Sequence, residues 1–213
     1  MNAAPGTFWD RFYSLNTMFE PKNITTHRLH LRTLSLVDAP AVQRLASDHD
    51  IAATTLSIPH PYPEDAAEQW IRTGVEAAER GELANFVITL TASGDLVGWI
   101  GLSINSDHDR AEMGYWIGKP YWGCGYATEA ARAVLHYGFE TVGLNRIVAH
   151  HMIHNPASGR ILTKIGMQRE GFMPQHIKKW DRYVDLIAYG ITRRRYDELI
   201  AEPRTNEEFE RTK

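Results

Sequence analysis

The hydrophobic residues of the chain recur with two different periods, and these periods predict its secondary structure. Alternation of apolar and polar residues is typical of a half-buried strand, whereas apolar residues at i, i+3, i+4 and i+7 are typical of one helix face. Alternation and short apolar runs between turn residues predict strands at residues 29–31, 86–90, 96–104, 111–117, 146–152, 172–179 and 183–189. The helical period predicts helices after residue 38, across 67–78, from 127 onward and from 156 to 165.

Residues with capping chemistry mark the ends of these helices. Asp38 and Asn155 stand at two predicted starts, where a side-chain oxygen accepts a hydrogen bond from a free N–H of the first turn. Gly81, Gly143 and Gly166 follow the last apolar positions of three helices, which is the usual place of a glycine that ends a helix.

The order of the elements predicts the sheet. Strand 111–117, the helix after it and strand 146–152 form a right-handed crossover, which places the two strands parallel. The two strands before this unit and the two after it are each joined by a short turn, the later one at Trp180 and Asp181, so both pairs are expected to be antiparallel hairpins. The sequence therefore predicts an α/β (α+β) fold with a mixed, mostly antiparallel central sheet flanked by helices.

Both ends of the chain differ in composition from its middle. Residues 1–23 are expected to be an amphipathic extension that packs on its own domain, or alternatively on the partner subunit of a homodimer. Its apolar stripe consists of Phe8, Trp9, Phe12, Leu15 and Phe19. Residues 24–200 are expected to form a single domain, and the charged residues 201–213 a disordered tail.

Composition excludes several classes of function. The formal net charge of -3 gives no basic footprint for nucleic acid or an anionic membrane. No run of 18 apolar residues occurs, so no membrane span is expected. A single cysteine excludes an internal disulfide and suits the reducing cytoplasm. The run of arginines at 193–195 is expected to be a solvated surface.

The most informative stretch is the glycine-containing turn at residues 122–128, between a predicted strand and the helix that follows. Gly123 and Gly125 allow backbone angles closed to other residues, and the amides at the helix start face outward with the positive end of the helix dipole behind them. This predicts an anion site. A dinucleotide fingerprint fails because Thr128 replaces its third glycine, and a nucleotide P-loop fails because G-x-x-x-x-G-K-[ST] is absent.

The same stretch resembles motif A of the GNAT N-acetyltransferases, Q/R-x-x-G-x-G/A, here Trp122-x-x-Gly125-x-Ala127. Trp122 departs from that motif. The longer strings at residues 111–117 and 121–130, and the opening Thr26-x-Arg28-Leu29-x-Leu31-Arg32, resemble the RimJ/RimL-type branch, in which an aromatic residue commonly occupies this position. The resemblance runs from about residue 26 to residue 196.

The resemblance implies the GNAT fold with splayed parallel strands, and acetyl-CoA as co-substrate. It implies that main-chain groups of Tyr115, Trp116 and Ile117 bind pantetheine, and that the early helices border the acceptor site. It also implies that the pyrophosphate is held by the amides of Gly123, Cys124, Gly125, Tyr126, Ala127 and Thr128. Asn155 and Ser158 match the family's Asn-x-x-Ser near the thiol end of the cofactor, where capping alone would also explain Asn155. The tyrosine that many relatives use to protonate the thiolate is absent, because Leu162 occupies its position.

Glu112 is the candidate catalytic base, since its strand leads into the turn; a solvated carboxylate is the alternative. Ser158, or water held by it, and less strongly Tyr183 are candidates for the missing proton donor. Cys124 at a helix N-terminus could instead form an acyl intermediate, although the family mechanism is direct attack. His150, His151 and His154 lie in a strand and a loop, so they are not expected to converge on a metal.

The sequence therefore predicts an N-acetyltransferase that moves acetyl from acetyl-CoA to an amine, with a protein N-terminal α-amine favoured. A small-molecule amine such as a polyamine, aminoglycoside or amino-acid derivative is the alternative acceptor. A non-catalytic acyl-CoA sensor is the alternative from another class, suggested by the missing tyrosine. Turnover on a broad amine panel would separate the enzymes from the sensor.

Overall fold

The computed structural model describes residues 23–202 of the protein. Its strands are β1 (Ile24–Thr25), β2 (Leu29–Thr33), β3 (Leu83–Leu90), β4 (Leu96–Asn105), β5 (Arg110–Ile117), β6 (Arg146–Met152), β7 (Gln168–Lys179) and β8 (Arg182–Thr192). Its helices are α2 (Ala39–Ala46), α3 (His49–Thr54), α4 (Ala66–Glu79), α5 (Tyr126–Glu140), α6 (Pro156–Lys164) and α7 (Arg193–Ala201), with 3-10 turns η1 (Leu36–Asp38), η2 (Ser106–His108) and η3 (Lys119–Tyr121). Within this range, no helix is long and apolar enough to cross a membrane.

The N-terminal extension predicted for residues 1–23 and the tail predicted for 201–213 lie almost entirely outside the described residues. Both segments, the domain limits drawn from them and the homodimer therefore stay predictions.

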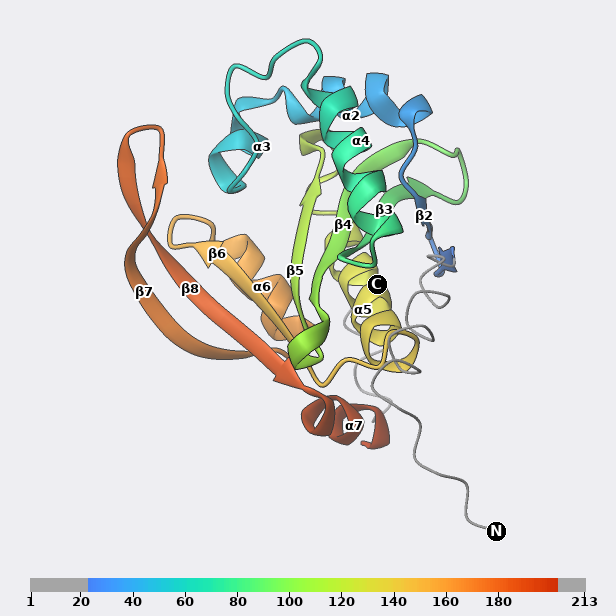
Figure 1. The fold of residues 1–213 in the computed structure, drawn as a ribbon, viewed down its shortest axis with the longest axis vertical. Coiled ribbons are helices and arrows are strands. Elements are labelled where there is room, and N and C mark those ends of the chain that lie inside the picture. The colour runs from blue at the N-terminus through green and yellow to red at the C-terminus, as the bar shows by residue number, and fades with distance from the viewer. Residues whose placement is uncertain (1–22, 203–213) are drawn as a thin grey trace.

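The strands form one eight-stranded sheet in the order β1-β2-β3-β4-β5-β6-β8-β7 (Figure 1). Neighbouring strands in it are antiparallel, apart from β5 and β6, which are parallel and connected through α5. This confirms the predicted mixed and mostly antiparallel sheet. The β7–β8 hairpin turns at Trp180 and Asp181, whose φ angles of 47° and 61° match the backbone twist that a two-residue hairpin turn requires.

The parallel pair is short, and this shapes the molecule. β5 and β6 pair only from Arg110 with Arg146 to Glu112 with Val148. Beyond these residues β5 continues to Ile117 beside β4, and β6 continues to Met152 beside β8. The two strands therefore diverge and divide the sheet into a larger wing of β1 to β5 and a smaller wing of β6, β8 and β7, as Figure 1 shows. The splayed strands implied by the family resemblance are confirmed.

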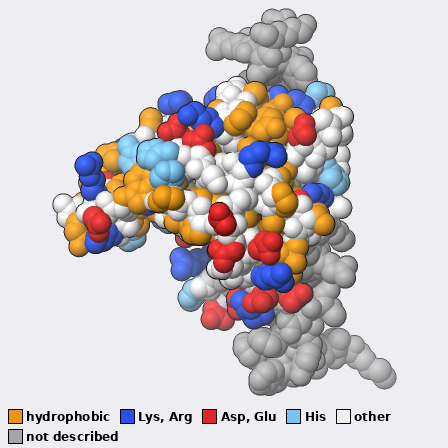
Figure 2. All heavy atoms as spheres, turned by 90° about the horizontal axis from the view of Figure 1, so that it is seen from above, with side chains coloured by type: hydrophobic (Ala, Val, Ile, Leu, Met, Phe, Trp, Pro, Cys, Tyr) orange, Lys and Arg blue, Asp and Glu red, His pale blue; other side chains and the backbone are white. Residues whose placement is uncertain are grey.

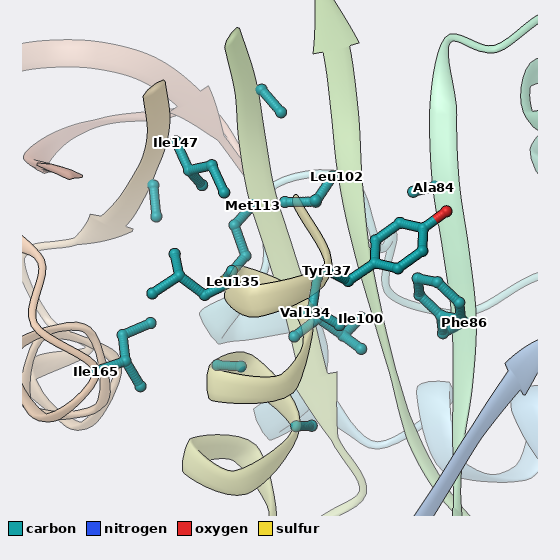
Figure 3. Close-up of a cluster of buried hydrophobic side chains, with 14 of the residues drawn as sticks. Ala84, Phe86, Ile100, Leu102, Met113, Val134, Leu135, Tyr137, Ile147 and Ile165 are labelled. Carbon is teal, nitrogen blue, oxygen red and sulfur yellow. The ribbon is translucent and has the colours of Figure 1, made fainter. Parts of the chain in front are cut away.

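Helices cover both faces of the larger wing, α4 on one face and α5 on the other (Figure 1). The core on the α5 face packs side chains such as Val134 and Tyr137 against Phe86, Ile100 and Leu102 of the strands (Figure 3). Gly138 lets α5 approach both β4 and β6 closely, because a Cβ there would lie 3.0 Å from Leu102 Cδ1 and 2.7 Å from Ile147 Cδ1. A second core lies under α2 and α4, so the sheet is held firmly from both sides.

Two local predictions need correction. Asp38 precedes α2 but makes no side-chain capping bond to it. Its carboxylate instead accepts hydrogen bonds from Arg32 at 2.9 and 2.5 Å and from the Ser35 N–H at 3.0 Å. The arginines at 193–195 are not uniformly solvated either: they form the first turn of α7, and Arg193 donates a 2.8 Å hydrogen bond to the Phe139 carbonyl. Asp38 and Arg193 thus bind groups on other elements of the fold, and local sequence patterns do not reveal such tertiary partners.

The Arg32–Asp38 pair generates a stability prediction, because Asp38 is only 4% exposed. Burial alone would raise the pKa of Asp38, but hydrogen bonds from Arg32 and Ser35 outweigh this and lower it. We expect Asp38→Asn to reduce the free energy of unfolding by about 2 kcal/mol. A carboxylate with a lowered pKa stabilises the fold above its unfolded pKa of about 3.9, and this contribution disappears as pH falls through the folded value.

Urea denaturation at neutral and acidic pH measures this effect. The matched control is Glu82→Gln, which removes the exposed partner of Arg80 and should leave the midpoint unchanged. An Asp38→Asn protein as stable as the wild type at neutral pH would contradict the assignment.

Candidate active site

A cavity of about 750 Å³ occupies the gap between the diverging strands. It is lined by β4, β5 and β6, by the starts of α5 and α6, and by the segment that joins α3 to α4. Tyr115, Trp116 and Ile117 line it from the part of β5 that has left β6. Their main chain thus borders the gap, which is the arrangement needed to add a pantetheine chain as an extra strand.

The predicted anion site has the expected backbone geometry. Gly123 and Gly125 have φ angles of 77° and 81°, in the left-handed region that favours glycine. Gly125 is the N-cap of α5, and the first bond of the helix is donated by the Glu129 N–H to the Gly125 carbonyl at 3.1 Å. The N–H groups of the three residues between them therefore have no partner within the helix. These residues, Tyr126, Ala127 and Thr128, all line the cavity.

The turn is fixed by interactions that the sequence did not reveal. The Trp122 indole N–H donates a 2.6 Å hydrogen bond to the Ile117 carbonyl and so ties the turn back to β5. Arg28 donates to the Cys124 carbonyl at 2.9 Å and pairs with Glu129 at 2.7 Å, while its guanidinium lies 4.8 Å from the Tyr126 ring centroid. Trp122 thus has a structural role where the family motif carries Gln or Arg.

Cys124 lies on the outside of this turn. It is exposed, and the cavity lining does not include it. Its sulfur lies 3.7 Å from the Trp122 carbonyl oxygen. The geometry therefore offers no support for an acyl intermediate on Cys124, and only its main chain remains a candidate for cofactor binding.

Glu112 lies on the cavity wall at the point where β5 and β6 separate, together with a histidine that sequence reasoning did not select. The Glu112 carboxylate Oε1 lies 2.9 Å from His150 Nδ1. This hydrogen bond lowers the pKa of Glu112, although burial opposes the shift. Because an ionised carboxylate can only accept, Nδ1 carries the proton, and the other ring nitrogen of neutral His150 is then an acceptor. Glu112 pairs with Val148, and His150 lies two residues further along β6, so the contact could be found only once the register of the two strands was known.

A second polar pair lies on the α6 side of the cavity. Asn155 caps α6 as predicted, because its side chain accepts a 3.3 Å hydrogen bond from the Ser158 N–H. The Ser158 hydroxyl lies 2.8 Å from the Tyr115 hydroxyl, whose pKa burial raises to about 12. Leu162, at the position of the missing tyrosine, is completely buried. Tyr115 therefore brings a phenol to Ser158 from β5, a role that sequence reasoning missed.

Of the remaining candidates, His151 lines the cavity, whereas Tyr183 and His154 do not. Tyr183 is 67% exposed and does not line the cavity. His151 is buried with Nδ1 2.8 Å from the Met152 carbonyl, and His154 Nε2 lies 2.9 Å from the Ala53 carbonyl. In residues 23–202, no three His, Cys, Asp or Glu side chains are grouped to hold a metal ion.

The splayed sheet, the free amides at the start of α5 and the paired polar side chains in one cavity fit the class of acyl-CoA-dependent transferases. The sequence model described as "Acetyltransferase (GNAT) domain" matches residues 28–168. The chain therefore belongs to the GNAT acetyltransferase family.

Relatives and solved structures agree with this assignment. The chain is 33% identical to the uncharacterized N-acetyltransferase YnaD of Bacillus subtilis (strain 168) over 171 residues, which cover 79% of this chain and 96% of YnaD. It is 35% identical to the [ribosomal protein uS5]-alanine N-acetyltransferase of Escherichia coli (strain K12) over 80 residues, 38% of this chain and 41% of that protein. Mycobacterium smegmatis RimJ in complex with CoA-disulfide has the same fold, with a TM-score of 0.75 at 22% identity, and the match covers 86% of this chain and 95% of that one.

The enzyme is therefore an acetyl-CoA-dependent N-acetyltransferase of the GNAT kind. Its residues fit this co-substrate. Gly125 carries no side chain beside the free amides of α5, and the bordering edge of β5 is open along the cavity. When bound, acetyl-CoA supplies the acetyl group as a thioester, which an amine converts to an amide.

The glycine turn generates a prediction about cofactor affinity. Gly125→Val places a branched side chain at a φ of +81° beside Arg28 and the free amides, so we expect CoA to bind at least tenfold more weakly, which corresponds to about 1.4 kcal/mol. Calorimetric titration with CoA measures this. The matched control is Gly94→Val, which imposes the same strain at a φ of +78° in a hairpin turn outside the cavity. Equal CoA affinity in both folded variants would refute the pyrophosphate assignment.

Proposed function

We propose that the enzyme acetylates the α-amine of a protein or peptide N-terminus by direct attack, with Glu112 and His150 accepting the proton of the amine. The observation that carries this proposal is the Glu112–His150 pair on the cavity wall where the two strands separate. It is the one place on that wall where a carboxylate meets an imidazole among the described residues.

The strength of this base favours an α-amine. The hydrogen bond from His150 lowers the pKa of Glu112, so the carboxylate is a weak base. An α-ammonium has a pKa of about 8, and roughly a tenth of it is already neutral at pH 7. A lysine or polyamine ammonium has a pKa of about 10.4, and fewer than about one copy in a thousand is neutral. A weak base therefore suits the first acceptor better than the second.

Charge in the cavity points the same way. Glu112 is the sole acidic residue among the described residues that line the cavity. A polyamine carries several ammonium groups, and burying them without paired carboxylates is costly. The Escherichia coli relative that acetylates an alanine of ribosomal protein uS5 gives further support to an N-terminal acceptor.

Ser158 and Tyr115 are assigned to the departing thiolate. A phenol with a pKa of about 12 is a much weaker acid than a thiol of about 8.5, so Tyr115 does not release its proton at equilibrium. When Tyr115 donates to the Ser158 oxygen, the serine hydroxyl is free to donate in turn. The pair therefore stabilises negative charge on sulfur by hydrogen bonding, and the missing tyrosine at Leu162 does not imply a sensor without turnover.

The acceptor class is tested by incubating the enzyme with acetyl-CoA and a panel of peptides, lysine derivatives, polyamines and aminoglycosides. We expect release of free thiol and an acetyl group on the α-amine in mass spectra. Turnover on small amines alone would favour the small-molecule alternative, and CoA binding without any turnover would favour the sensor.

The base generates a prediction for the pH–rate profile. Glu112→Gln should lower kcat about a hundredfold at pH 7 while CoA affinity is retained. Because higher pH supplies neutral amine, part of the rate should return up to a plateau near the α-amine pKa of about 8. Glu82→Gln, the same change outside the cavity, serves as the control. Full turnover by Glu112→Gln between about pH 6 and pH 10 would show that this carboxylate is only a solvated strand residue.

The thiolate pair generates a second kinetic prediction. Ser158→Ala removes a hydrogen bond to a charged group and should lower kcat by about tenfold or more, with a smaller loss for Tyr115→Phe. Tyr183→Phe removes a hydroxyl outside the cavity and should have no effect. Single-turnover rates decide the matter: if Ser158→Ala and Tyr183→Phe are equally fast, the thiolate is stabilised elsewhere.

A further inference from the structure

We call the part of the cavity lined by Trp70, Trp99 and Glu112 the acceptor half, and its floor is aromatic. Gly101 of β4 and Gly114 of β5 are direct cross-strand partners. The Trp99 indole lies over both, since a Cβ at Gly101 would meet Trp99 Cζ2 at 2.6 Å and a Cβ at Gly114 would meet Cζ3 at 3.6 Å. Two adjacent glycines thus let the indole lie flat on the sheet, where its ring faces the cavity.

This indole is held in place. Its N–H donates a hydrogen bond to the side-chain oxygen of Asn85, which is only 3% exposed. Trp70 of α4 packs on it edge to face, with ring centroids 5.4 Å apart and an interplanar angle of 75°. Both tryptophans line the cavity. Because the polar group of the indole is already satisfied, the exposed part of Trp99 presents only apolar surface.

The walls above this floor are apolar as well. Val42, Ile51, Ile58 and Tyr62 of the α2, α3 and following segments line the cavity. Burial among them raises the pKa of the Tyr62 hydroxyl. The segment between α3 and α4 reaches across to the β7–β8 hairpin, where Lys179 Nζ donates a 2.6 Å hydrogen bond to the Ile58 carbonyl. The surface view shows hydrophobic and histidine side chains side by side on the projecting arm of the molecule (Figure 2).

Aromatic contacts of Trp180 add to the hydrogen bond between Lys179 of the β7–β8 hairpin and Ile58. Trp180 stacks on His49 with centroids 5.0 Å apart, and His60 lies 6.3 Å away. These contacts join α3 and the segment after it to the β7–β8 hairpin, and so hold in place a segment that lines the cavity.

The proton acceptor and the aromatic floor are adjacent. Glu112 and Gly114 point to the same face of β5, since side chains alternate along a strand. Two residues along a strand span about 6.6 Å, and the Trp99 indole lies over Gly114, two residues from Glu112. The indole is therefore about one side-chain length away from the Glu112 position. If the α-amine of a peptide lies beside Glu112, the side chain of the first residue of that peptide can therefore lie over the indole.

We propose that the floor of Trp99 and Trp70 is a specificity pocket for the side chain of the acceptor's first residue, and that the enzyme prefers a large apolar or aromatic residue there. This inference rests on the proposed acetylation of α-amines. Small N-terminal residues such as alanine or serine would leave the indole surface uncovered, whereas phenylalanine or leucine would bury it.

Peptides that differ only in their first residue test the inference. We expect kcat/KM for an N-terminal Phe or Leu peptide to exceed that for the Ala and Ser peptides by about tenfold or more, which is the usual range for filling a hydrophobic pocket. Trp99→Ala and Trp70→Ala should each reduce this Phe/Ala ratio severalfold while CoA affinity is unchanged. Phe172→Ala, which removes an exposed aromatic ring outside the cavity, should keep the wild-type ratio.

Several results would overturn the pocket. A wild-type enzyme that prefers the Ala or Ser peptide contradicts it, as does a Trp99→Ala enzyme that slows on Phe and Ala peptides equally with CoA binding intact. If Trp99→Ala fails to bind CoA, the Phe/Ala ratio of Trp70→Ala replaces it, and an unchanged ratio in that variant contradicts the pocket.

Two small amines separate this inference from the proposed function. If 2-phenylethylamine is acetylated in a Trp99-dependent way and no peptide is, the proposed N-terminal function fails and the aromatic pocket stands. If spermidine is the best acceptor, both fail. If Ala and Ser peptides are the best acceptors, the N-terminal function stands and the pocket fails.

Discussion

The early end of the β5–β6 ladder is the constraint on which the rest of the structure depends. Parallel strands normally pair along their length, yet β5 and β6 pair at only three positions and then diverge. Each strand stays in place because its other edge is fully paired, β5 with β4 and β6 with β8, and because cores lie on both faces of the larger wing. The gap is therefore built into the strand pairing, and it contains the cavity.

Three functional regions follow from that gap. At one end the helix α5 begins with free amides, held by the Trp122 and Arg28 hydrogen bonds. In the middle, Tyr115 and Ser158 meet across the gap from β5 and α6. At the point of separation, Glu112 meets His150 next to the indole of Trp99. The cofactor, the thiolate and the amine proton are thus each assigned, in the proposed function, to a separate group of residues on the wall of one cavity, and β5 contributes to both side-chain pairs.

Local patterns predicted the glycine turn and most of the elements, though not α3 or α7, because period, capping residues and positive-φ glycines act within a few residues. The family resemblance, together with the strand position of Glu112, made Glu112, Asn155 and Ser158 candidates, and the structure places all three on the cavity. Sequence reasoning missed His150 as the partner of Glu112, the Tyr115 side chain beside Ser158, and the indole over Gly101 and Gly114. Each of these depends on strand register or on which face a side chain takes, and neither is encoded locally. The wrong assignment of Asp38 as a helix cap has the same origin, since its partner Arg32 lies on another element.

The central claim is that acetyl-CoA binds along the opened edge of β5 and at the start of α5. Hydrogen exchange with and without CoA tests it most directly, because it reports on main-chain amides. The account predicts that CoA slows exchange at residues 113–117 and 126–128, while the short ladder at residues 110–112 changes little. Protection that appears elsewhere, with these two segments unchanged, would contradict it.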